Sequence, residues 1–421
     1  MRNLREFYAN GHIKQEESCF FINPERSNER LVKCIDQGFY VLLQGVRGSG
    51  KTTRTMYAIK HQLPKYCALY VSLQSLEYSD PQSFWTTFTH CLLQDNRHKI
   101  HTDQVVPVKD AGGFKDLFAK PELFEEGKRA VLFVDEFDLL LYGKEEVRTS
   151  FLDALRFLKE NRETRCLHSV VGVGPLKVID VVKDAKISPF NIGESITTPK
   201  FTMEDTKALF LQFCNDYRAQ ISEETIKDIF ERTGGHPGHT CMCGKEIQES
   251  LLRGKLKLVH DDWVQFAVHT LPISVSFRWK IGSQLRKRLD AKCQEFLLNY
   301  FLASEDRRIR LEEEDNIQMA IDLSAVGVLA GDPATNEFWI PSPLIRSIIW
   351  STLSLRGQLS VPHPISMGNL DLIAAIKTGS LCSTKQRCFE HFQNLLRATE
   401  MTRQKSIATQ KYPMNTPIKL N

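Results

Sequence analysis

The chain has 421 residues, of which 42% are hydrophobic and 25% are charged, a composition typical of soluble globular proteins with two or three domains. The 55 basic and 51 acidic residues give a net charge of +4, too balanced to indicate a nucleic-acid or membrane surface by itself. With no apolar run long enough for a membrane span, no apolar secretory signal and 11 irregularly spaced cysteines, the sequence predicts a cytoplasmic or nuclear protein without a membrane partner.

The N-terminal half alternates short apolar runs with amphipathic stretches, which predicts a parallel α/β sheet. The expected strands are residues 38–44, 67–73, 130–138 and 166–174. The expected helices are a stretch that follows the glycines near residue 50 and stops at Pro64, residues 81–94 and residues 145–161. Residues 95–113 are polar and end in Gly112 and Gly113, so we expect a surface loop there.

From Phe201 onward the pattern predicts helices, with Thr202 and Ser222 at positions typical of N-caps. The later part predicts helices at 284–304, 315–329 and 343–353, with a short strand pair around Gly331 before the last of them, which is the order of a winged helix. One more helix is expected near 384–400, followed by a disordered end. The predicted domains are an N-terminal segment (1–28), a P-loop core (29–200), a helical lid (201–255), a winged-helix-like domain (256–353) and a partly disordered tail (354–421).

The segment GVRGSGKT, which directly follows the first strand, fits the P-loop pattern G-x-x-x-x-G-K-[ST], also called Walker A. Its glycines allow backbone N–H groups to surround a phosphate, Lys51 is expected to reach the β- and γ-phosphates, and the Thr52 hydroxyl to hold Mg²⁺. Arg47 either contacts phosphate or points to solvent. The predicted nucleotide-binding residues of this loop are Gly45, Val46, Arg47, Gly48, Ser49, Gly50, Lys51, Thr52 and Thr53.

Asp135 and Glu136, near the carboxyl end of the strand AVLFVDEFD, provide the second half of the predicted site, a Walker B motif. Asp135 is expected to bind Mg²⁺ through water, and Glu136 to act as general base on an attacking water. A strand lies between the glycine loop and this acidic strand in the sequence, as in P-loop ATPases that carry a catalytic glutamate. We find no N-K-x-D-like element for a guanine base, so the sequence favours ATP hydrolysis over GTP hydrolysis or transfer to a metabolite.

These elements together resemble the STAND-type AAA-like ATPases, and more narrowly the ATPase-like domain of fungal and oomycete Crinkler-type proteins. The resemblance covers about residues 20–353 and depends on FINPERSNERLVKCIDQGFYVLLQGVRGSGKTT, the VDEFD segment, SPFNIG (188–193), the Phe201 segment and TGGHPG (233–238). It implies a parallel sheet of the ASCE (RecA/AAA-like) P-loop class, a helical lid and a winged-helix-like domain. It also implies that His236 and Pro237 lie near the nucleotide and report its state.

Two parts of the usual ATPase site have no clear counterpart. The strand 166–174 ends in Gly-Val-Gly where related ATPases carry a polar sensor, and Ser169 lies inside this strand. An arginine finger is expected from a neighbouring subunit or domain, and Arg162 and Arg165 lie where oligomeric relatives place one, although surface arginines are the commoner interpretation.

The function predicted from the sequence is a slowly hydrolysing Mg·ATP switch in which nucleotide state is coupled to movement of the lid and the winged-helix-like domain. The alternatives are a non-hydrolysing, nucleotide-regulated module that contacts DNA or a protein, and the ATPase part of a Crinkler-type effector without its nuclease-like domain. The expected partners are ATP or ADP, together with a protein or a second copy of the chain. Nucleic acid is less favoured, because the acids at 312–315 oppose the nearby arginines.

Overall fold

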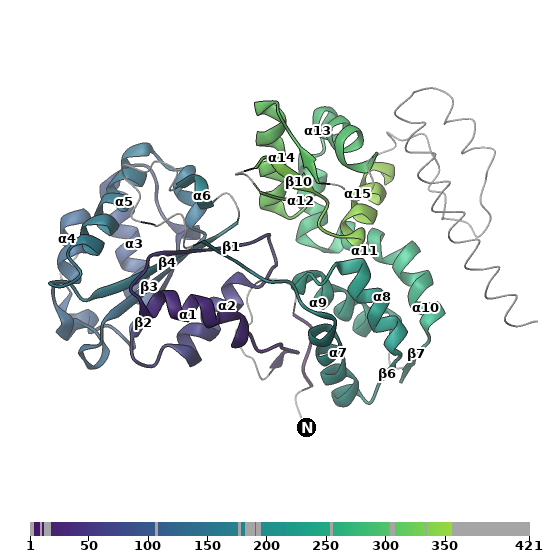
Figure 1. The fold of residues 1–421 in the computed structure, drawn as a ribbon, viewed down its shortest axis with the longest axis horizontal. Coiled ribbons are helices and arrows are strands. Elements are labelled where there is room, and N and C mark those ends of the chain that lie inside the picture. Colours follow the sequence, from purple (N-terminus) through teal and green to yellow (C-terminus); the bar gives the residue numbers. More distant parts are fainter. Residues whose placement is uncertain are drawn as a thin grey trace, which may run out of the picture.

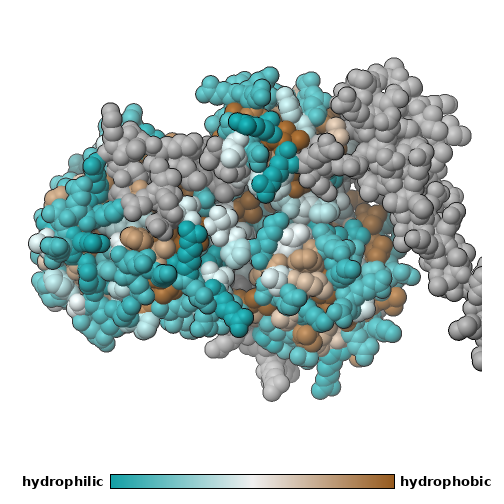
Figure 2. Space-filling model, viewed as in Figure 1, coloured by the Kyte–Doolittle hydropathy of each residue, from teal (hydrophilic) through white to brown (hydrophobic). Residues whose placement is uncertain are grey.

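The computed structural model describes residues 4–8, 11, 18–105, 108–175, 178–181, 190, 195–252, 256–303, 308–332 and 335–355. These residues form a lobe built on a parallel sheet and a helical lobe beside it (Figure 1). On the face shown in Figure 2, hydrophilic residues cover most of the described surface and hydrophobic ones form scattered groups. Within the described ranges, no helix combines the length and the apolar character needed to cross a membrane.

The sheet has five parallel strands in the order β2-β3-β4-β1-β5, which confirms the predicted parallel α/β class. The strands are β1 (Val41–Gln44), β2 (Cys67–Ser72), β3 (Ala130–Asp135), β4 (Leu167–Gly174) and β5 (Ser195–Thr197). Gln44 lies opposite Gly174 on one side and Thr197 on the other, so β1 lies between β4 and β5. The carboxyl end of β4 therefore lies between the ends of β1 and β3.

Helices cover both faces of this sheet, which explains why its strands are apolar runs without alternation. One face packs against α1 (Glu29–Asp36) and the π-helical turn Ala58–Gln62 that follows α2 (Lys51–Tyr57), as shown by buried Leu31, Ile35 and Ala58. The other face packs against three helices, whose aromatic residues fill the core of this lobe. They are α3 (Pro81–Asp95), α4 (Ala111–Leu117) and α5 (Glu145–Glu160).

The first strand begins at Val41 rather than at 38, and the sheet lobe differs from the sequence prediction more clearly at three other places. The third strand ends at Asp135 rather than 138, because Glu136 turns to a left-handed backbone and Phe137–Leu141 form a 3₁₀-helix. The expected loop at 95–113 contains the start of α4, since the Asp110 side chain accepts a hydrogen bond from the Gly113 amide and caps that helix. The short strand β5 was not predicted.

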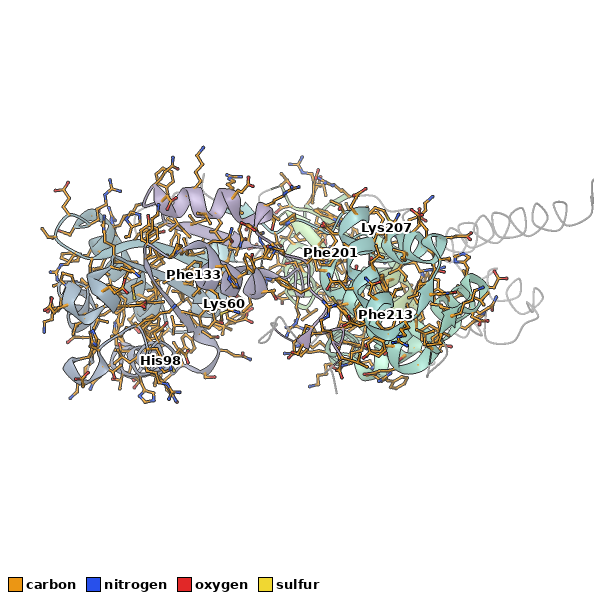
Figure 3. The ribbon with its side chains drawn as sticks, turned by 90° about the horizontal axis from the view of Figure 1, so that it is seen from below. Lys60, His98, Phe133, Phe201, Lys207 and Phe213 are labelled. Atoms are coloured by element: carbon orange, nitrogen blue, oxygen red, sulfur yellow. The ribbon has the colours of Figure 1, made fainter. Side chains whose placement is uncertain are left out.

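The helical lobe begins after Phe201, where the chain leaves the sheet lobe (Figure 3). Thr202 forms a capping box with Asp205 at the start of its first helix, and Ser222 caps the second, so both predicted N-caps are confirmed. The third helix begins at the proline of the GGHPG segment. The three helices are α7 (Met203–Tyr217), α8 (Glu223–Thr233) and α9 (Pro237–Glu246), and a short parallel pair, β6 (Gln220–Ile221) and β7 (Lys257–Leu258), lies beside them.

The C-terminal part of the described chain contains the predicted helices and hairpin with changed bounds. The helix expected at 284–304 is interrupted, because one helix ends at Arg288 and the Asp290 side chain then caps the next helix. The elements are α10 (His260–Gln265), α11 (Leu271–Arg278), α12 (Lys280–Arg288), α13 (Ala291–Phe296), β8 (Ile309–Arg310), α14 (Glu314–Val326), β9 (Ala330–Asp332), β10 (Glu337–Trp339) and α15 (Pro343–Leu355). β8 adds a third strand to the hairpin. The helix expected near 384–400 and the predicted disordered end lie outside the described residues.

A single hydrophobic cluster runs through this lobe, from Phe7 and Phe20 near the N-terminus to Leu353 in α15. Phe213 of α7 lies within it (Figure 3). The predicted N-terminal segment therefore packs against the lid helices, and the lid helices share a core with the C-terminal elements.

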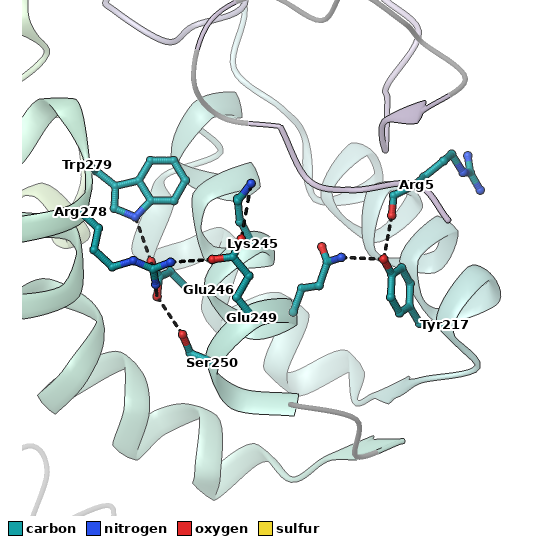
Figure 4. Close-up of polar contacts among 9 residues, drawn as sticks. Arg5, Tyr217, Lys245, Glu246, Glu249, Ser250, Arg278 and Trp279 are labelled. Atoms are coloured by element: carbon teal, nitrogen blue, oxygen red, sulfur yellow. Dashed lines mark hydrogen bonds and ion pairs between the residues drawn. The ribbon is translucent and has the colours of Figure 1, made fainter. Parts of the chain in front are cut away.

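A buried carboxylate joins α9 to the elements that follow it. The side chain of Glu246 is 1% exposed and accepts hydrogen bonds from Arg278 at 3.1 and 3.2 Å and from the Trp279 indole at 2.9 Å (Figure 4). It also accepts a hydrogen bond from Ser274 at 3.0 Å. Arg278 also reaches Glu249 one turn further along. Because Glu246 bonds to several elements at once, α9 and the α11–α12 corner are expected to move as one unit.

Candidate functional site

The glycine loop, residues 45–50, joins the end of β1 to the start of α2. Gly48 and Gly50 have φ values of 75° and 87°, in the left-handed region that favours glycine. Gly45 packs so closely that an added Cβ would overlap the Thr198 hydroxyl, which itself donates to the Ser49 hydroxyl at 2.7 Å. The shape of this loop therefore requires glycine at positions 45, 48 and 50. Sequence reasoning missed Thr198, whose role depends on the unpredicted strand β5.

Lys51 turns back over the loop. Its ammonium group donates to the backbone carbonyls of Gly45 at 2.8 Å and Val46 at 3.1 Å. Burial lowers the pKa of Lys51, while Asp135 and Glu136 act in the opposite direction. The cation is thus held between the loop and the acidic strand, which is the position from which it can meet phosphate oxygens.

Thr52 and Asp135 meet directly although they are far apart in sequence. The Thr52 hydroxyl donates to Asp135 Oδ2 at 2.8 Å, and the Tyr70 hydroxyl of β2 donates to the same oxygen at 3.0 Å. Asp135 is 6% exposed, and its Oδ1 accepts the Glu136 amide at 2.9 Å. Burial and the nearby Asp135 raise the pKa of Tyr70, so the phenol keeps its proton and donates. A hydroxyl and a carboxylate at this spacing are the oxygen donors that suit Mg²⁺.

Glu136 is the residue at which β3 changes direction. Its φ and ψ are 54° and 40°, a left-handed conformation that is strained for a side chain other than glycine. The side chain is exposed and lines the cleft beside Asp135. The turn therefore directs a carboxylate into the cleft, free of the buried bonds that hold its neighbour.

Asp138 is a third acid of this site that sequence reasoning did not single out. It is 6% exposed, it lines the cleft, and its buried Oδ1 has no hydrogen-bond partner. Burial, and then the charge of Glu136, raise the pKa of Asp138 to about 6. The sequence signal for a buried acid at this site was a carboxylate two residues after Glu136 among apolar residues, in the segment FDLLL.

Asp138→Asn is expected to stabilise the nucleotide-free and metal-free protein at neutral pH. The ordinary pKa of this carboxyl is 3.8 and the folded-state value is about 6, so its ionisation opposes folding by at most about 3 kcal/mol. This cost is absent below about pH 4, grows as pH rises and is complete above about pH 6. Urea unfolding at pH 7.5 and pH 4 measures the gain. An equal gain at both pH values would contradict this account.

The GGHPG turn contacts the backbone carbonyls of the glycine loop. The His236 Nε2 donates to the Arg47 carbonyl at 3.1 Å, and the Gly238 amide donates to the Gly48 carbonyl at 3.0 Å. His236 also caps α9 by accepting the His239 amide on Nδ1, and burial lowers the pKa of His236 to about 3, so the ring is neutral. The structure therefore brings the lid and the loop together. Contact of His236 and Pro237 with a nucleotide stays a prediction.

Arg47 lies close to the C-terminal elements of the helical lobe. A Cβ at Gly327, the residue that ends α14, would lie 3.5 Å from the Arg47 Cβ, so the loop also meets the C-terminal elements. Arg165, which precedes β4, forms an ion pair with Asp116 at 3.4 Å. The Ser169 hydroxyl, within β4, donates a hydrogen bond to the Phe39 backbone carbonyl. Neither of these two residues joins the site of this chain.

A cleft of about 1650 Å³ lies over these residues. Its walls are formed by the N-terminal segment at 20–27, the glycine loop, the acidic turn, the lid turn and α12, which contributes Lys280 and Arg288. The predicted residues that line this cleft are Arg47, Gly48, Ser49, Gly50, Lys51, Thr52, Thr53, Asp135, Glu136, His236 and Pro237. Gly45 and Val46 are not part of its lining, and their carbonyls accept hydrogen bonds from Lys51. The predicted loop, acids and lid turn are thus assembled around a single cleft.

Comparisons with known proteins agree with this fold. A Walker-type ATPase of Pyrococcus abyssi is similar in structure, with a TM-score of 0.58, 13% identity and coverage of 81% of this chain and 99% of that chain. The ORC2 protein of Aeropyrum pernix, solved in complexes with ADPNP and ADP, gives a TM-score of 0.52, 11% identity and coverage of 84% and 98%. A search of curated proteins finds no match. The profile of the AAA-like domain matches residues 8–252, more than half of the chain, and the chain therefore belongs to the AAA-like domain family.

Proposed function

We propose that this protein binds Mg·ATP in the cleft and hydrolyses it slowly as a STAND-type switch. The observation that carries the proposal is the meeting of Thr52, Asp135 and Lys51 at the ends of β1 and β3, with Glu136 free beside them. Thr52 and Asp135 would hold Mg²⁺, which supplies positive charge to the β- and γ-phosphate oxygens. Lys51 would exchange its loop carbonyls for phosphate oxygens, and Glu136 would take a proton from the attacking water.

Slow turnover is supported by the groups that the site contains. The lid turn presents a neutral His236 to the loop, and β4 ends in glycine. Among the described residues of the cleft, the cations of the helical lobe are Arg278, Lys280 and Arg288, and Lys200 lies just before that lobe. In this proposal none of them acts as an arginine finger without a change in the position of the lobe, or without a second copy of the chain.

The ATPase rate measured against protein concentration tests the proposal, with Lys51→Ala as the inactive reference. We expect a low rate for the wild type and loss of both ATP binding and turnover for Lys51→Ala. A rate per molecule that is flat with concentration supports a monomeric switch, and a steep rise supports an arginine supplied by a neighbouring copy. Equal rates for the wild type and Lys51→Ala would overturn the proposal.

Coupling between the nucleotide and the helical lobe is supported by the contacts of the lid turn. His236 and Gly238 hold the loop from outside, and α9, which starts at this turn, ends at the buried Glu246. A change in loop shape on phosphate binding would therefore be passed along α9 to the α11–α12 corner. The proposed winged-helix-like part, 256–353, lies at the receiving end of this path.

Gly238→Ala is expected to loosen the lid. An added Cβ would lie 2.8 Å from the Gly48 carbonyl oxygen, so the lid turn must move away from the glycine loop. This movement weakens the 3.0 Å hydrogen bond from the residue 238 N–H to the Gly48 carbonyl. Loss of one such bond, about 1.4 kcal/mol, corresponds to about tenfold faster release of a fluorescent ATP analogue in stopped-flow measurements. Gly113→Ala is the matched control, also in the first turn of a helix, where a Cβ has no neighbour nearer than 3.5 Å. Equal release rates for the two variants would refute the coupling.

A second candidate function is a nucleotide-regulated binding module that does not hydrolyse ATP, and the glycine at the end of β4 favours it. Tight ATP binding without turnover would identify it. We favour a protein partner over DNA because the basic residues are partly occupied: Arg308 lies over the Trp339 ring at 4.6 Å and pairs with Glu337. Two further parts of the proposed function are a relationship to Crinkler-type ATPase regions and a cytoplasmic or nuclear location.

A further inference from the structure

The carboxyl end of β4 lies between the glycine loop and the acidic turn, yet its last residue has no side chain. β4 pairs with β1 on one side and with β3 on the other, and it ends at Gly174. This is the place at which the sequence led us to expect a polar sensor and offered Gly-Val-Gly instead. A group that assists the reaction from this position must therefore come from another element.

Asp138 fills that place. A Cβ at Gly174 would lie 3.1 Å from Asp138 Oδ1 and 3.2 Å from the Val178 Cβ, so glycine at the strand end leaves the room that the carboxyl group occupies. The side chain comes from the 3₁₀-helix that follows Glu136, and it is 94% buried with Oδ1 unpartnered. The charged groups that act on it are Glu136, Lys51 and Asp135, all residues of the proposed site.

We propose that Asp138 orients the attacking water for ATP hydrolysis, in place of a side chain at the end of β4. The inference rests on the proposed ATPase function. The water gives one proton to Glu136 and donates its second O–H to the Asp138 carboxylate, which accepts it without taking the proton. The water oxygen bonds to the γ-phosphorus as the bond from that phosphorus to the bridging oxygen breaks, and ADP leaves with the electron pair.

The chemistry of the group supports this assignment. A buried carboxylate oxygen without a donor is costly, and a water hydrogen would satisfy it. Because the attacking water has two hydrogens, it needs two acceptors to point its lone pair at phosphorus, and Glu136 provides only one. A pKa raised to about 6 leaves Asp138 ionised, and therefore an acceptor, at pH 7.5.

Single-turnover hydrolysis and equilibrium binding of a fluorescent ATP analogue with Mg²⁺, at pH 7.5, test the inference on Asp138→Ala and Asp138→Asn. We expect Asp138→Ala to lower kcat about 10- to 100-fold, with KM and analogue affinity within about twofold of the wild type. Asp138→Asn keeps an acceptor oxygen of the same shape and should recover most of the rate. Asp153→Ala, at an exposed acid of α5, is the control for an unchanged rate.

A double-mutant cycle with Gly174→Ala tests the geometry. The added Cβ should displace Asp138 and lower kcat, but it should cost little more in the Asp138→Ala background. Asp138→Ala with wild-type turnover would overturn the inference, as would a parallel loss of ATP affinity and kcat, which indicates a structural role. If instead the wild type shows no turnover while it binds ATP, the proposed hydrolysis itself fails, so the two failures are distinguishable.

Discussion

Glu136→Gln is expected to lower kcat for ATP at least about 100-fold while ATP binding is retained. General base catalysis contributes about 10²- to 10⁴-fold, and glutamine keeps the length and shape of the side chain but accepts no proton. This substitution leaves the left-handed backbone at φ 54° in place. It also keeps the hydrogen bond that the backbone N–H of residue 136 donates to the Asp135 carboxylate. The Thr52–Asp135 pair at 2.8 Å is also untouched, so the predicted magnesium donors keep their positions.

Single-turnover hydrolysis with radiolabelled ATP measures this effect, and fluorescent-analogue titration measures binding. Glu145→Gln is the matched control, because it removes an exposed carboxylate at the start of α5 in the same lobe. Lys51→Ala provides the contrast, with binding lost as well as turnover. A Glu136→Gln variant that turns over as fast as the wild type would exclude this residue as the base.

Glu246→Ala is expected to lower the free energy of unfolding by about 2–4 kcal/mol. Its carboxylate is 1% exposed and is satisfied by Arg278, the Trp279 indole and Ser274. Alanine leaves the buried indole N–H without an acceptor and the guanidinium without its buried partner, and each such loss is costly. Arg278 is itself 50% exposed, so water compensates part of the lost charge pair and the effect stays below that of a fully buried pair.

Urea unfolding followed by tryptophan fluorescence reports this change, since Trp279 is one of the contacts. Glu249→Ala is the internal control because Glu249 binds the same arginine at 2.6 Å but is 38% exposed, so we expect less than about 1 kcal/mol. Equal losses for the two variants would mean that the solvated side of Arg278, and not the buried carboxylate, stabilises this corner. In the proposed switch, Glu246→Ala should also weaken the effect of ATP on the helical lobe.

Local sequence patterns predicted the parts of the fold that depend on local chemistry. Continuous apolar runs identified four of the five sheet strands, and the caps Thr202 and Ser222 were read from their residue types. The strand β5 was missed because three residues of mixed polarity give no periodicity. The start of α4 was missed because Gly112 and Gly113 indicate a loop. The Asp110 side chain nevertheless stabilises a helix there, because it accepts a hydrogen bond from the Gly113 amide as an N-cap.

The candidate site was predictable where a motif fixes the residue types, as in the loop and the acidic pair. The sequence marks Asp138 as an acid close to Glu136, but the roles of Tyr70 and Asp138 were not predictable, because these roles follow from strand order and register rather than from neighbours in sequence. Tyr70 reaches Asp135 since β2 lies beside β3, and Asp138 matters since β4 ends at Gly174 beside it. The contact of the lid turn with the loop carbonyls likewise depends on how the two lobes fold together.

The two loop carbonyls that hold the lid belong to consecutive residues, Arg47 and Gly48. A single rotation of that short stretch therefore breaks both bonds together, and partial release has little to stabilise it. The lid should respond cooperatively, with open and closed populations exchanging as two states rather than along a gradual path. In the proposed switch, ATP and ADP would each shift this equilibrium only by the ratio of their affinities for the open and closed forms, so a large change in the exposed surface of the helical lobe would require a large difference in that ratio.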